Sequence, residues 1–191
     1  PIVSTEKAAK VMLRLWKRKY NVVPDLLVIE GPKAGGHLGF RREQLETFTD
    51  ETYAQEVKKI LTVVRETEAG SHKKIPVVLA GGIYDRSDMD AALALGVDGV
   101  QMGTRFVTTY ECDADVSYKQ AYINCTKEQI GIVKSPVGMP GRAIFNPFIK
   151  NGSHKVDKKC LHCLEHCNPK EIPYCITRAL IAAAKGNLEE A

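Results

Sequence analysis

Short apolar runs alternate with amphipathic segments along the first hundred residues of the chain. Residues 26–29 are a continuous apolar run, as expected for a strand buried on both faces of a parallel sheet. Residues 75–80 and 97–102 are expected to be further buried strands, and residues 1–4 a first one. Helical patterns lie between these runs. Four strands that alternate with helices predict right-handed βαβ units, and therefore an α/β fold with a parallel sheet.

The helical patterns have recognisable ends. Ser4 or Thr5 is expected to cap the first helix, and Asn21 and Pro24 to end it. A second helix is predicted over 50–67, and a third from a cap at Ser87 or Asp88 to Gly96. Beyond them, the Pro- and Gly-rich stretch 135–152 is expected to be irregular, and 173–186 to be a final helix.

Composition narrows the class of protein. A chain of 191 residues can form one domain with a sizeable core. Its net charge of +4 is spread along the chain, and no polybasic block with aromatic spacing argues for a nucleic-acid partner. No apolar run reaches the roughly 18 residues of a membrane span, and no signal peptide is visible. The chain starts at Pro1 without Met, so we expect a fragment or one product of a cleaved chain.

Four of the six cysteines crowd into one short segment. Cys160, Cys163, Cys167 and Cys175 have the spacing C-x₂-C-x₃-C-x₇-C, and His162 and His166 offer nitrogen ligands beside them. Four thiolates could hold zinc or an Fe–S cluster, although the spacing matches no standard pattern. The alternatives are reduced, partly buried cysteines or a redox-active C-x₂-C pair. Such a cluster favours a cytoplasmic location over a secreted disulfide framework.

Glycine clusters follow three successive predicted strands. They are Gly31 to Gly39, Gly81-Gly82, and Gly103 with Thr104. Glycines after strands often serve only tight turns. Three clusters in a row, each with polar atoms attached, indicate more than turns, because the carboxyl ends of barrel strands carry the active site. The second and third clusters predict a phosphate site, where backbone N–H groups and the Thr104 hydroxyl donate to the phosphate oxygens.

The three clusters together carry a resemblance to a known family. Ala34-Gly35-Gly36-His37, Ala80-Gly81-Gly82-Ile83 and Gln101-Met102-Gly103-Thr104-Arg105-Phe106 resemble the nitronate monooxygenase (2-nitropropane dioxygenase) family. That family shares its fold with the FMN-dependent enoyl-acyl-carrier-protein reductases. The resemblance runs from Pro1 to about residue 150. Any one of the three motifs alone would be a weak signal.

The resemblance implies a fold and a cofactor site. The fold is the C-terminal half of an FMN-binding (β/α)₈ TIM barrel, with four β/α units over residues 1–134. Residues 135–191 would add the irregular segment, the Cys-rich tail and a helix packed on the barrel. The implied FMN contacts are Glu30, Gly35, Gly36, Gly81, Gly82, Gln101, Met102, Gly103 and Thr104. Many members of the family have Gln at the position of Glu30. The negative charge of a glutamate there would disfavour an anionic flavin.

His37 is the catalytic residue that the resemblance implies. A lone histidine is more often structural, but His37 is expected on a loop at the active-site face, between glycines. Histidine titrates near neutral pH, so a neutral imidazole can accept a proton there. Abstraction of the proton beside a nitro group gives a nitronate, which then passes an electron to flavin and on to oxygen.

Three functions remain open at this point. The first is an FMN-dependent oxidoreductase that oxidises alkyl nitronates with O₂. The second is a flavin-dependent enoyl-acyl-carrier-protein reductase, which would need NADH or NADPH. The third is a non-catalytic metal-binding module based on the cysteines. Because a closed barrel usually needs about 250 residues and eight strands, we also expect this chain to associate with an N-terminal half-barrel or a second copy of itself.

Overall fold

A computed structural model describes residues 1–152, 160, 163, 165 and 167–190 of the chain. It divides into two compact units, Pro1–Gly103 and Thr104–Ala191. The sequence placed its boundary between residues 134 and 135, according to membership of the barrel rather than compactness. That assignment stays a prediction.

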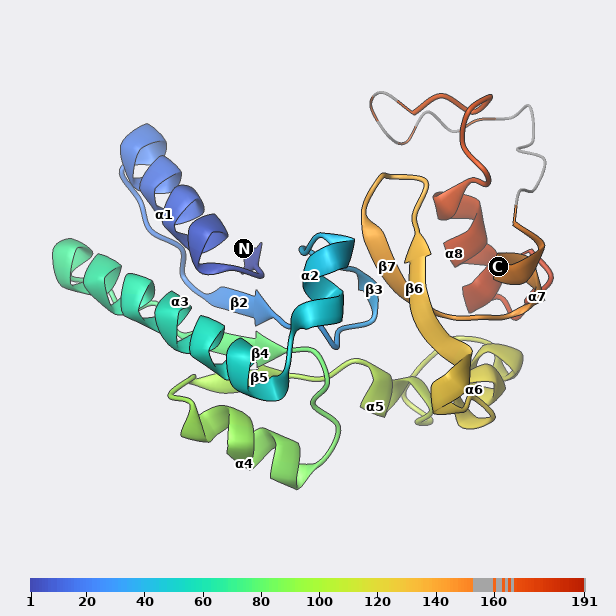
Figure 1. The fold of residues 1–191 in the computed structure, drawn as a ribbon, viewed down its shortest axis with the longest axis horizontal. Helices are drawn as coiled ribbons and strands as arrows, with labels where there is room; N and C mark the ends of the chain where they lie inside the picture. Colours follow the sequence, from blue (N-terminus) through green and yellow to red (C-terminus); the bar gives the residue numbers. More distant parts are fainter. Residues whose placement is uncertain (153–159, 161–162, 164, 166, 191) are drawn as a thin grey trace. The chain divides into compact units, whose positions relative to one another are not determined.

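The first unit contains the predicted parallel sheet (Figure 1). Within the described residues, four strands pair in the order β1-β2-β4-β5, and every pair is parallel. Their bounds are β1 (Ile2–Val3), β2 (Leu27–Glu30), β4 (Val77–Ala80) and β5 (Gly99–Gln101). The alternation of strands and helices is therefore confirmed.

The helices of this unit lie where the sequence expects them, with sharper ends. They are α1 (Glu6–Tyr20), α3 (Asp50–Ser71) and α4 (Arg86–Ala94). Thr5, and not Ser4, caps α1, and Asn21 ends it in the left-handed conformation. The prediction of Ser87 or Asp88 as the cap of α4 is wrong. The side chain of Asp85 accepts from the N–H of Asp88, which forms a capping box one turn earlier.

The core lies between the sheet and the helices that cover it. Leu27 and Ile29 alternate along β2 and are fully buried, as is Val77 on β4. Val57, Ile60 and Val64 come from one face of α3 and are also fully buried. Figure 1 shows α1 and α3 running side by side along the sheet. This packing fixes the positions of β2 and β4, and therefore of the loops that begin at their carboxyl ends.

The connection from β2 to α3 is long and carries its own short elements. They are β3 (Gly36–His37) and α2 (Arg42–Thr47). Phe48 joins this connection to the core, because its ring meets Phe40 edge-on at 5.1 Å between centroids and Tyr53 at 6.1 Å.

The second unit is more regular than its sequence predicts. The stretch 135–152, expected to be irregular, contains strand β7 (Pro140–Ile144) and helix α7 (Pro147–Asn151). β7 pairs antiparallel with β6 (Ile130–Lys134). The unit also has α5 (Thr104–Val107), α6 (Val116–Ile123), a 3₁₀ turn (Lys127–Gln129) and α8 (Ile176–Ala184). Of these, the sequence predicted only α8.

None of the helices in the described part of the chain has both the length and the apolar character that a membrane crossing needs.

Candidate active site

The carboxyl ends of three strands form one row. Glu30 at the end of β2 is in register with Ala80 at the end of β4, and Ala80 is in register with Gln101 at the end of β5. The three glycine clusters therefore leave the sheet as neighbours at one edge. This is the juxtaposition that the sequence predicted, and in open α/β sheets such an edge is where ligands bind.

The loop after β2 lies directly against the loop after β4. The N–H of Gly31 donates to the carbonyl of Ala80 at 2.8 Å, which extends the pairing of the strands beyond Glu30. The N–H of Ala34 then donates to the carbonyl of Gly31 at 3.1 Å and closes a turn. This turn places Lys33 and Ala34 over the next loop.

Gly81 and Gly82 are required where they stand by conformation and by space. Their φ angles are 96° and 80°, in the region that side chains rarely adopt. A Cβ on Gly81 would lie 3.0 Å from the Cβ of Ala34, and one on Gly82 would lie 2.8 Å from the Cβ of Lys33. These two glycines therefore let the two loops pack. They can contribute to a ligand only through their backbone groups.

Other glycines at this edge face open space. No heavy atom lies within 4 Å of the Cβ position of Gly35, Gly36 or Gly103. Nothing in the packing of the described residues demands glycine at Gly35 or Gly103, whose φ angles are ordinary. A bare backbone beside open space suits close approach of a ligand, as a phosphate or a flat ring system requires.

Glu30 is a partly buried carboxylate in this row. Burial raises the pKa of its carboxyl above the ordinary value, and the N–H of Gly39, which donates to the carboxylate, opposes that rise. Gly39 in turn lies against the hydroxyl of Ser4, which is 5% exposed at the end of β1. The loop after β2 therefore also packs closely against the residue that follows β1.

His37 lies in the same loop with its side chain exposed. The sequence expected a loop position; the structure has it in the two-residue strand β3. Gln101 and Gly103 are exposed, and Met102 is half-buried. Thr104 is the first residue of α5 and belongs to the second unit. The roles of these residues stay predictions.

Three residues of this edge were not singled out from the sequence as part of the site. Ser4 was considered only as a helix cap. The ammonium of Lys33, whose stem covers Gly82, pairs with Asp50 at 2.6 Å. The hydroxyl of Tyr53 is buried behind Gly31 and has no hydrogen-bond partner among the described residues. Only Ser4, the last residue of the first predicted strand, carried a sequence signal.

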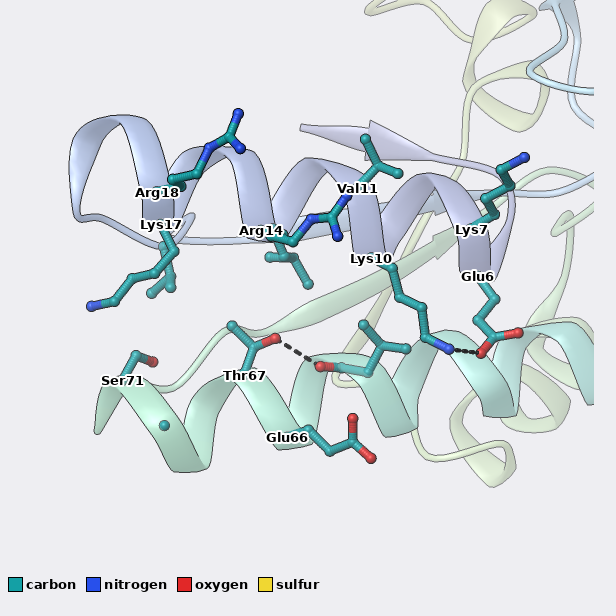
Figure 2. Close-up of a pocket in the computed structure, with 14 residues that line it drawn as sticks. Glu6, Lys7, Lys10, Val11, Arg14, Lys17, Arg18, Glu66, Thr67 and Ser71 are labelled. Carbon is teal, nitrogen blue, oxygen red and sulfur yellow. Dashed lines mark hydrogen bonds and ion pairs between the residues drawn. The ribbon is translucent and has the colours of Figure 1, made fainter.

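A groove in the first unit lies away from this edge. It lies between α1 and α3, has a volume of about 1020 Å³, and contains none of the glycine clusters (Figure 2). The strand-end edge is therefore a candidate site because of its strand register and backbone geometry, and not because it forms a deep groove.

The four clustered cysteines are described, whereas His162 and His166 fall outside the described residues. Among the residues that are described, no three His, Cys, Asp or Glu side chains are grouped so that they could hold a metal ion. Within the described residues, none of the four cysteines is in a disulfide, and the Sγ of Cys163 lies 3.1 Å from the Oγ1 of Thr177. A metal at Cys160, Cys163, Cys167 and Cys175 stays a prediction, which metal analysis of the purified protein tests.

Comparison with protein families gives one match along the whole chain. The profile described as nitronate monooxygenase matches residues 1–191. A probable nitronate monooxygenase of Staphylococcus saprophyticus is 38% identical over 135 residues, which are 70% of this chain and 34% of that protein. One from Staphylococcus aureus is 34% identical over 129 residues, 68% of this chain and 34% of the relative.

Two solved structures also superpose on a large part of this chain. FabK from Thermotoga maritima superposes with a TM-score of 0.58 at 30% identity, over 79% of this chain and 40% of that one. A nitroalkane oxidase from Streptomyces ansochromogenes superposes with a TM-score of 0.54 at 28% identity, over 78% and 39% of the two chains. The chain thus spans about a third of the curated relatives that it matches.

Proposed function

This chain belongs to the nitronate monooxygenase family, and on that premise we propose that it carries the FMN site and the catalytic histidine of an oxidoreductase that oxidises alkyl nitronates with O₂. The observation that carries the proposal is the row of Glu30, Ala80 and Gln101, three strand ends in register that continue into the three glycine clusters.

The fold that goes with this proposal is half of a barrel. The four parallel strands would be the last four of a (β/α)₈ TIM barrel, whose active site lies at the carboxyl ends of its strands. The superposition on FabK supports a barrel, and the 40% of that chain that is covered supports only a part of one.

The residues at the edge fit an FMN in two ways. Gly81, Gly82, Gln101, Met102, Gly103 and Thr104 would hold the phosphate through backbone N–H groups and the Thr104 hydroxyl. Glu30, Gly35 and Gly36 would face the ring, and the open space beside Gly35, Gly36 and Gly103 supports this arrangement. When bound, FMN supplies electron transfer between the substrate and oxygen.

His37 would accept a proton. A neutral imidazole nitrogen takes the proton from the carbon beside the nitro group, and the electron pair of that C–H bond moves onto the nitro group to give the nitronate. The exposed side chain of His37 is accessible to a small substrate. A substrate supplied already as the nitronate does not need this step, so the two forms of substrate separate the role of His37 from that of the flavin.

Glu30 would influence the charge of the site. An ionised carboxylate beside the ring disfavours an anionic flavin, but burial raises the pKa of this carboxyl and so enlarges its neutral fraction. Glu30 in place of the glutamine of many family members is therefore compatible with flavin binding.

Oxygen uptake by the intact protein tests the proposed activity. Ethyl nitronate should drive oxygen consumption without NADH or NADPH. Consumption of NAD(P)H with an enoyl thioester under anaerobic conditions, with no response to the nitronate, would instead select the reductase. A protein that binds metal, lacks flavin and catalyses neither reaction would select the non-catalytic alternative.

A further inference from the structure

Charged and polar side chains of both helices line the groove between α1 and α3 (Figure 2). Leu13, Val23 and Val63 form the floor and are nearly inaccessible, with exposed fractions of 2%, 6% and 7%. Val11, 40% exposed, adds apolar surface on the α1 wall. Apolar side chains therefore lie at the bottom of the groove, and Val11 is the exposed one among these four.

The α1 wall is strongly cationic. It carries Lys7, Lys10, Arg14, Lys17 and Arg18, all exposed. Lys10 pairs with Glu6, the one acid of α1. The other four cations make no ion pair with any residue that the structure describes. Glu66 on the α3 wall is the other acid of the groove.

Ordinary helix electrostatics do not account for this wall. Lys17 and Arg18 lie in the last turn, where cations favour the helix dipole. Lys7 lies in the first turn, where a cation is disfavoured. Lys10, Arg14 and Arg18 follow each other at spacing i, i+4, at which like charges destabilise a helix. The free chain therefore carries unfavourable charge interactions that an anionic partner would relieve.

We propose that this groove docks an acidic amphipathic helix of a partner protein. The apolar stripe of such a helix fits the floor, and its flanking carboxylates pair with the four free cations of α1. A helix lies naturally between two others, and the 15 residues of α1 extend about 22 Å, enough for four turns. An apolar floor and the acids Glu6 and Glu66 do not suit a phosphate backbone, which needs cations on its whole path.

Binding of a designed peptide to the intact protein tests this proposal. The probe is a fluorescent 18-residue helical peptide with leucines along one stripe and glutamates on both flanks. We expect saturable binding by fluorescence anisotropy that weakens as salt rises. The triple variant Lys7→Glu/Arg14→Glu/Arg18→Glu should weaken it about tenfold or more. Val11→Asp should also weaken it, because it places a charge on the apolar surface.

The matched control reverses three exposed cations elsewhere, Lys58→Glu/Lys127→Glu/Lys134→Glu, with the same change in net charge. It should bind the peptide nearly as the wild type does, and circular dichroism should show all variants folded. The proposal is overturned by three outcomes. One is no binding of the peptide, another is equal loss in the groove and control variants, and the third is tighter binding of single-stranded RNA or anionic lipid vesicles than of the peptide.

Discussion

The glycines at the carboxyl ends of the strands are of two kinds, those that packing and conformation require and those that neither requires. Gly81 and Gly82 have positive φ angles and lie against Ala34 and Lys33, so packing and conformation both exclude a side chain. Gly103 meets neither condition, because its φ is ordinary and its Cβ position faces open space. A substitution at Gly103 therefore tests ligand access without testing folding.

At this position we predict that Gly103→Val releases FMN from the intact protein while the fold persists. The branched side chain would occupy space through which phosphate oxygens approach the backbone. Flavin content after gel filtration and the melting temperature measure the two effects. Gly70→Val, at an exposed helical glycine that also faces open space, is the control and should keep its flavin. A Gly103→Val protein with normal FMN affinity would contradict the proposed phosphate site.

Asp98 directly precedes β5, at the amino ends of the strands, and links this end of the sheet to α3. Its carboxylate accepts from the N–H of Val77 at 2.9 Å and from Arg65 at 3.1 Å, and Lys74 lies 3.2 Å away. Burial alone would raise the pKa of this carboxyl, but these three donors outweigh it and hold the pKa at about 2.

Because the folded pKa of Asp98 lies below the ordinary aspartate value of about 3.9, ionised Asp98 stabilises the fold. This stabilisation is complete above about pH 4 and is lost as the pH falls towards 2. Asp98→Asn should lower stability at pH 7 by about 1 kcal/mol. It should also flatten the dependence of melting temperature on pH between about 4 and 2. Asp113→Asn, at an exposed site, should keep that dependence. An unchanged pH profile in Asp98→Asn would contradict the stabilising role of the ionised Asp98 carboxylate.

At the level of elements, apolar pattern predicted those that bury apolar side chains on a regular period. β2, β4, α1 and α3 were predicted for that reason. The hairpin of β6 and β7 was missed because Pro140, Gly141 and Gly131 are residues that usually interrupt strands. The cap of α4 was misplaced because Asp85, Ser87 and Asp88 all suit a cap, and only the backbone decides between them.

Strand β2 should be the least tolerant of the four parallel strands, because it lies in the middle of the sheet and its inward side chains are fully buried. We predict that Ile29→Ala lowers the free energy of unfolding by about 2–5 kcal/mol through lost burial and a cavity. Ile123→Ala, at a side chain that is 59% exposed, should cost far less. Denaturant unfolding of both variants compares them; similar losses would show that β2 is not part of the core described.

At the scale of the whole molecule, the sequence predicted the proximity of the three strand ends better than it predicted the second unit. Three motifs after three predicted strands sufficed to predict that proximity, because neighbouring parallel strands have their carboxyl ends on the same side of the sheet. The register of Glu30, Ala80 and Gln101 confirms that proximity. The contacts of Lys33 and Tyr53 could not be predicted, since they depend on how the long β2–α3 connection folds back on the strand ends.

The sheet has β1 and β5 at its edges within the described residues, and Ile2 on β1 is 60% exposed. Open strand edges favour pairing with another chain. We predict that these 191 residues, produced alone, associate with the remaining half of the barrel or with a second copy, and bind FMN more weakly than the intact protein. Sedimentation velocity with flavin detection measures both. A monodisperse monomer with tightly bound FMN would show that the half-barrel is self-sufficient.

We propose that the strand-end edge holds FMN and that His37 acts as the base there. The most direct measurement follows the visible absorbance of flavin bound to the intact protein after anaerobic mixing with ethyl nitronate or with neutral nitroethane. We predict that the flavin of the wild type bleaches with both substrates. His37→Asn should keep its flavin, bleach with the nitronate, and lose at least about 100-fold in rate with nitroethane. Equal rates for wild type and variant with nitroethane, or a purified protein without flavin, would contradict it.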